Sequence, residues 1–119
     1  MPRLDLSDAP VIEIGDVRLT ERDRLSAIGT WRGRMVNEFI SARVFSGLIP
    51  QMMAADIPAV HIRAVASMIS EELSHASLCA GVLKGVGGVP MAELPELPPV
   101  ATHPGVAPLE ALLRNILSI

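Results

Sequence analysis

The sequence has few of the features that mark several common protein classes. A single cysteine among 119 residues excludes an internal disulfide framework. The net charge of -3 and the lack of a basic cluster argue against a nucleic-acid-binding surface. The N-terminus has no apolar segment of the signal-peptide type, and charged residues interrupt every apolar run long enough to cross a membrane. We therefore expect a cytoplasmic protein with neither nucleic acid nor membrane as a partner.

Aromatic and charged residues are also scarce, which leaves an apolar chain. Only 3% of the residues are aromatic and 19% are charged, whereas half are apolar. A small domain has much surface relative to its volume and needs polar residues to cover that surface. The excess of apolar residues therefore predicts that a partner subunit, or polypeptide beyond this sequence, covers part of the molecule.

The pattern of apolar residues predicts an all-α fold within one domain. Residues 1–20 contain two prolines and are expected to form an irregular arm. Helical periodicity starts near residue 21 and continues to about residue 53. A turn follows, with Pro58 at the start of a second helix that runs to about residue 84. These two segments are long enough to form an antiparallel hairpin.

The C-terminal third begins with a long connection. Residues 85–108 hold six of the ten prolines, so we expect a connection without regular secondary structure. A third helix starts near Pro108, and its apolar pattern continues to the last residues.

Each long helix carries a stripe of mostly apolar residues at heptad spacing. Steps of three and four residues keep such a stripe on one face, which must pack against a neighbour. Glu38 is the polar exception in the first stripe, whereas Glu72 and His75 interrupt the second in mid-helix. Burying a carboxylate is unfavourable unless it is paired or binds a cation. The stripes comprise Ile28, Trp31, Met35, Glu38, Ala42, Phe45, Ile49 and Met52, and His61, Val65, Met68, Glu72, His75, Cys79, Val82 and Val86.

The two carboxylates of these stripes are predicted to lie at the same height in the hairpin. Each is about 14 or 15 residues from the turn, or about 21 to 22 Å along its helix. His75 follows Glu72 by one turn on the same face. Carboxylate oxygens together with a neutral imidazole suit iron, manganese or zinc better than magnesium or calcium. The sequence therefore predicts that Glu38, Glu72 and His75 form half of a metal site.

These residues also carry a family resemblance. A Glu on one helix, followed by Glu-x-x-His on the next, resembles the first half of a ferritin-like di-iron carboxylate protein, such as a ferritin or a rubrerythrin. The segments NEFISARVF and EELSHASLC are similar to those of bacterial ferritin-like domain proteins. The resemblance covers about residues 21–119, although only three positions in it carry the chemistry.

The resemblance implies that residues 21–119 belong to a ferritin-like four-helix bundle, in which residues 85–108 are the crossover before the third helix. It implies a di-iron centre of the oxidase or ferroxidase type, with manganese or zinc as alternatives. Glu38 would be a terminal carboxylate ligand, Glu72 the bridging carboxylate and His75 the nitrogen ligand. The protein would then be an oxidoreductase.

The sequence departs from the family pattern in its second half. A complete site needs another Glu and another Glu-x-x-His, and Glu110 lies too near the start of the third helix to supply the former. The missing half is expected from a second copy of the chain or from the C-terminal half of a longer protein. The end of the sequence within an apolar helical pattern favours the longer protein.

Other polar residues have simpler interpretations. Glu71 is expected to face solvent, Cys79 to be a small core residue, His61 to lie in the helix interface and His103 to be exposed. Two other functions stay open. The protein is alternatively a non-catalytic helical oligomerisation module whose Glu–His pair is structural, or a carrier that holds a small apolar ligand between its helices.

Overall fold

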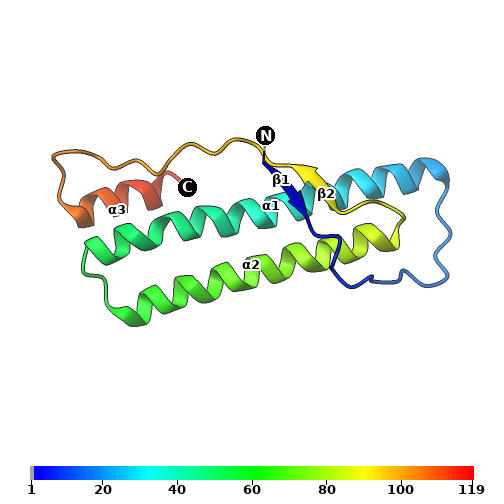
Figure 1. Ribbon diagram of the computed structural model, residues 1–119, viewed down its shortest axis with the longest axis horizontal. Helices are drawn as coiled ribbons and strands as arrows, with labels where there is room; N and C mark the ends of the chain where they lie inside the picture. The colour runs from blue at the N-terminus through cyan, green and yellow to red at the C-terminus, as the bar shows by residue number, and fades with distance from the viewer. Residues whose placement is uncertain (1) are drawn as a thin grey trace.

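The computed structural model describes residues 2–119 and confirms the long antiparallel hairpin (Figure 1). The structure is mostly helical, and α1 packs along α2 while α3 packs on α1. A small antiparallel sheet of two strands adds to the helices, which the all-α prediction did not include. The elements are β1 (Arg3–Asp5), α1 (Glu21–Ala54), α2 (Ala59–Gly85), β2 (Met91–Glu93) and α3 (Pro108–Leu117).

The start of α1 follows from its N-cap. The Thr20 side chain accepts a hydrogen bond of 3.1 Å from the backbone N–H of Asp23, which satisfies one of the free donors of the first turn. Glu21 and Asp23 add negative charge where the helix dipole favours it. The helix then continues through the exposed Pro50 to Ala54, one residue beyond the predicted end.

Two sharp turns bound α2. Before it, Asp56 adopts a left-handed conformation (φ 54°), and Pro58 is the N-cap, so that the helix starts one residue later than predicted. After it, the Gly88 N–H donates to the Leu83 carbonyl at 2.8 Å and the Gly87 N–H donates to the Lys84 carbonyl at 3.0 Å. This Schellman arrangement needs the positive φ of 88° at Gly87, which glycine adopts without strain. The helix therefore ends at these glycines, close to the predicted end near residue 84.

The N-terminal arm is more ordered than the predicted irregular segment. Its strand β1 pairs with β2, so that Leu4 lies opposite Ala92. The arm then crosses the end of α2, where the Ile12 N–H donates to the Gly81 carbonyl at 3.0 Å. Lys84 fixes the same segment, because its ammonium group donates to the carbonyls of Ser7 and Ala9. The arm and part of the 85–108 connection thus form regular structure against the hairpin, and the prediction of two irregular segments is wrong there.

The apolar core forms two clusters along the hairpin. One surrounds the buried Met35 and Leu83 and includes Leu4 from the arm. The other surrounds Leu48 and Met52 of α1, which contact Leu112 of α3. Trp31 and Phe45, both members of the predicted stripe on the first helix, are half-buried beside these clusters. The stretch of the hairpin between the two clusters contains Glu38, Glu72 and His75, and the helix packing on either side fixes their spacing.

The helices themselves show no membrane-spanning candidate. Within residues 2–119, none of them combines the length and the apolar character that crossing a membrane requires.

Candidate metal centre

Glu38, Glu72 and His75 come together as the sequence predicted. Each offers one ligand atom, and the three atoms lie within 4.8 Å of one another. The His75 Nδ1 atom lies 3.5 Å from Glu38 Oε2 and 4.0 Å from Glu72 Oε2. Glu38 comes from α1 and the other two from α2, so the antiparallel register of the hairpin creates the cluster. The equal heights predicted for the two carboxylates are consistent with this geometry.

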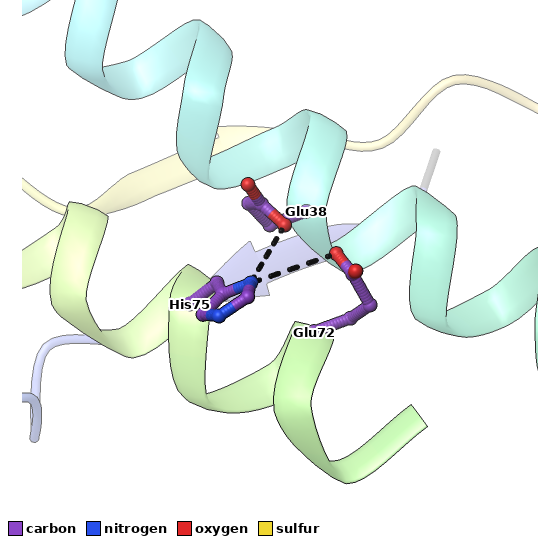
Figure 2. Close-up of side chains that lie close together, drawn as sticks. All are labelled: Glu38, Glu72 and His75. Carbon is purple, nitrogen blue, oxygen red and sulfur yellow. Dashed lines mark ion pairs between the residues drawn. The ribbon is translucent and has the colours of Figure 1, made fainter. Parts of the chain in front are cut away.

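The cluster lies on the side of the hairpin that the arm leaves uncovered. Figure 2 shows the three side chains between the two helices, with both strands behind them on the far side. The side chains of Glu38 and Glu72 are 33% and 23% exposed, and that of His75 is 51% exposed. The centre is therefore open to solvent and accessible to further ligands.

The predicted stripe of α2 does not face α1 as a whole. Glu72 and Cys79 point towards α1 and are half-buried and buried, whereas Met68 and His75 lie at the open edge and are exposed. His61, expected in the helix interface, is exposed as well. The prediction of a single buried stripe on α2 is thus wrong for these three residues, and His75 reaches the carboxylates from the side.

Glu38 perturbs the carboxyl group of Glu72. The pKa of Glu72 is raised above its ordinary value, mainly because its protonated form can donate a hydrogen bond to Glu38, and further because of desolvation and the negative charge of Glu38. The charge on a protonated His75 opposes this shift. Within the described part of the chain, His75 is the one side chain that forms an ion pair with either carboxylate. A cation between them would relieve the repulsion.

Cys79 lies one turn beyond His75 and is buried, as predicted. Burial raises the pKa of its thiol, and the charge of Glu38 raises it further, against a smaller opposing effect of Arg34. The thiol therefore stays protonated at neutral pH, which is unfavourable for metal binding because the thiolate is the ligand.

The remaining polar candidates do not belong to the cluster of Glu38, Glu72 and His75. Glu71 is exposed, as predicted, and Glu110 forms an ion pair of 2.8 Å with Arg114 on α3. His103 was expected to be exposed, but it is half-buried and its Nε2 lies 2.8 Å from Asn115 Oδ1. Asn115 in turn donates to Gln51 on α1. His103 is thus part of a polar contact that holds α3 and the 85–108 connection on α1. The periodicity of the sequence does not predict this contact.

Two shallow hollows lie outside the cluster. One, of about 230 Å³, lies between α1 and the start of α3, and the other, of about 300 Å³, lies beside the end of α2. Neither is lined by Glu38, Glu72 or His75. These hollows therefore do not place a small apolar ligand between the two long helices at the level of the cluster.

Comparison with known proteins gives no relative. No protein-family model matches the chain, and neither curated proteins nor solved structures provide a significant match. The function must therefore be argued from the geometry of the chain itself.

Two carboxylates and an imidazole at these distances have a defined chemical capacity. They can contribute three ligand atoms to one transition-metal ion, or share two carboxylates between neighbouring ions. Three protein ligands leave further coordination positions open, as catalytic metal sites require. The donor set therefore fits iron, manganese or zinc.

Proposed function

We propose that this protein is a metal-binding protein of ferritin-like type, and that Glu38, Glu72 and His75 are half of its di-iron site. The observation that supports this most is the convergence of three ligand atoms within 4.8 Å from two helices. A solvated surface pair would not require both carboxylates to interrupt apolar stripes at the same height. The proposal includes a four-helix bundle, in which this hairpin supplies two helices and a second copy or the rest of a longer chain supplies the others.

The chemistry of the proposal is iron oxidation. Bound iron would supply one-electron chemistry, with O₂ or peroxide as the electron acceptor. The residues of this chain would hold the metal, with Glu38 as a terminal ligand, Glu72 as a bridge and His75 as the nitrogen donor. The open coordination positions would admit the oxidant. The other half of the ligand set would come from a second copy or from the C-terminal half of a longer chain.

The experiment that tests the metal site is a titration of the purified protein with Fe²⁺ under anaerobic conditions, followed by metal analysis. We expect stoichiometric binding that Glu38→Ala, Glu72→Ala and His75→Ala each reduce at least tenfold. Glu110→Gln, which removes an exposed carboxylate of α3, is the control and should bind like the original protein. Equal binding by all four variants would refute the assignment. Admission of air then tests the oxidase chemistry through the rate of Fe³⁺ formation.

A second candidate function is a helical interaction module in which Glu72 and His75 form a structural pair. The observation in its favour is the apolar exposure on α2, where Val60 is 66% exposed and Leu78 is 56% exposed. This function predicts an assembly that forms equally in the presence of a chelator and of iron. Assembly of the original protein without any bound metal would favour it over the metal site.

A further inference from the structure

The hairpin is closed at both ends. The turn at residues 55–58 joins α1 to α2 at one end, and the arm closes the other end, where it runs from β1 across the end of α2 to the start of α1 (Figure 1). We call residues 7–19 of the arm the crossing segment. Glu38 lies near the middle of α1, about 26 Å from Glu21 and about 24 Å from Ala54 along the helix. The turn is a covalent link between the helices, whereas the crossing segment reaches α2 through non-covalent contacts alone, so it is the closure that can open.

Lys84 connects the crossing segment to α2. Its ammonium group donates hydrogen bonds of 2.8 Å to the Ser7 carbonyl and of 2.9 Å to the Ala9 carbonyl. Lys84 is the one lysine of the sequence, and within residues 2–119 it forms no ion pair with a carboxylate. An uncharged side chain without donors at this position would therefore remove both hydrogen bonds at once.

Few other contacts hold the crossing segment in place. Ala9 is buried, Ile14 is half-buried, and the other residues of the segment are exposed. One backbone hydrogen bond to α2, from the Ile12 N–H to the Gly81 carbonyl, adds to the two bonds of Lys84. Segments with few buried apolar contacts open locally at a lower free energy than the helices that they cover. We therefore expect the crossing segment to detach while the helices stay folded.

The crossing segment also packs on the core beside the candidate metal cluster. Ala9 belongs to the same core as Met35 of α1 and Cys79 of α2. Met35 lies one turn before Glu38 on α1. Cys79 lies one turn after His75 on α2, so this core borders ligands from both helices. Metal ligands need positions that are fixed to within about 0.5 Å, and a closed segment helps to fix them.

We propose that the crossing segment is a releasable strap, held by Lys84, whose opening and closing regulate the metal affinity of the cluster. The strap follows from contacts of the metal-free chain, whereas its effect on metal binding rests on the proposed function. When the segment is open, helix packing alone holds this end of the hairpin, and the ligands lose part of their preorganisation. By thermodynamic linkage, the factor by which closure strengthens metal binding equals the factor by which a bound metal favours closure.

Amide hydrogen exchange of the metal-free protein, in a buffer with a chelator, tests the strap. The Ile12 N–H reports opening of the segment, and the N–H of the fully buried Met35 reports unfolding of the hairpin. We expect the protection factor of Ile12 to be lower by about tenfold or more. It should also depend less on urea, because opening the segment exposes little surface. Equal protection factors with equal urea dependence would show that the segment opens only on unfolding and would overturn the proposal.

Substitution of Lys84 tests how the strap is held. Lys84→Met should lower the protection factor of Ile12 by about tenfold or more, because two charge-assisted hydrogen bonds are lost. Lys84→Arg, which keeps the charge and the donors, should lower it less. Arg63→Met removes a positive charge from an exposed position on the same helix and is the matched control. Equal effects of Lys84→Met and Arg63→Met would refute the role of Lys84, and far-UV circular dichroism checks that all three variants are folded.

Saturation with Zn²⁺, which has no redox chemistry, tests the regulation. We expect Zn²⁺ to raise the protection factor of Ile12 by about fivefold or more in the original protein and to have no effect in Glu72→Ala. Zn²⁺ binding that leaves Ile12 unchanged would overturn the regulation and leave the proposed function intact. Failure of the original protein to bind Zn²⁺, with the metal-free exchange as expected, would instead contradict the proposed function and its regulation and leave the strap.

Discussion

The arm crosses α2 at Gly81, and substitution of this glycine gives a sharp prediction. A Cβ atom at Gly81 would overlap the carbonyl oxygen of Pro10, a backbone atom that cannot move without displacing the arm. In an exposed helix interior, Gly→Ala stabilises a protein by about 1 kcal/mol. Here the overlap costs about 1 to 3 kcal/mol, and the hydrogen bond from Ile12 to the Gly81 carbonyl, worth about 1 kcal/mol, is strained or lost. We expect Gly81→Ala to lower the free energy of unfolding by about 1 to 3 kcal/mol.

Gly29→Ala is the matched control for this substitution. Gly29 also lies inside a long helix, but a Cβ atom there would meet nothing within 4 Å. We expect it to raise the free energy of unfolding by about 1 kcal/mol. Urea denaturation followed by far-UV circular dichroism measures both variants against the original protein. Stabilisation by Gly81→Ala equal to that by Gly29→Ala would show that the arm does not dock on α2 as described.

Three further predictions follow from the helix cap, the carboxylate pair and the exposed methionines. Thr20→Ala removes the N-cap of α1 and should lower the free energy of unfolding by about 1 kcal/mol in the same urea assay. The raised pKa of Glu72 means that the folded metal-free protein binds a proton there more tightly than the unfolded chain does, so its stability should fall as pH rises through that pKa. Glu72→Gln should therefore be more stable than the original metal-free protein at neutral pH and lose this dependence, as thermal unfolding at several pH values would detect. Iron with peroxide should oxidise Met68, which lies one turn from Glu72, faster than it oxidises Met53. Met53 is 59% exposed but lies about 22 Å from Glu38 along α1. Equal oxidation rates of the two methionines, measured by mass spectrometry, would argue against iron at the cluster.

Residue pattern was sufficient to predict the hairpin and the cluster. Thr20, the turn at Pro58 and the glycines after Lys84 are local signals, and each determines a helix end within one or two residues. Once the turn is placed, the rise of a helix fixes which residues lie level with each other. Glu38 and Glu72 follow from this arithmetic alone, without any knowledge of side-chain packing.

Other features depend on contacts that the pattern does not encode. At 3.6 residues per turn, Met68 and His75 lie about 40° and 60° around the helix from Glu72, on the same side, so they are at the edge of the face that Glu72 presents to α1 although they belong to the same series. Strands of three residues are too short to show alternation, and β1 pairs with β2 only after the connection has returned past α1. The contact between the arm and Gly81 also joins residues that are far apart in the sequence. A glycine inside a helix does not indicate which segment packs against it.

The central claim is that Glu38, Glu72 and His75 bind a transition metal. The most direct measurement is the stoichiometry and affinity of Fe²⁺ binding to the purified protein, compared with Glu72→Ala. We predict bound iron in the original protein and at least a tenfold weaker affinity in the variant, with Glu110→Gln unchanged. An original protein that binds no iron, manganese or zinc above the level of Glu72→Ala would contradict the claim.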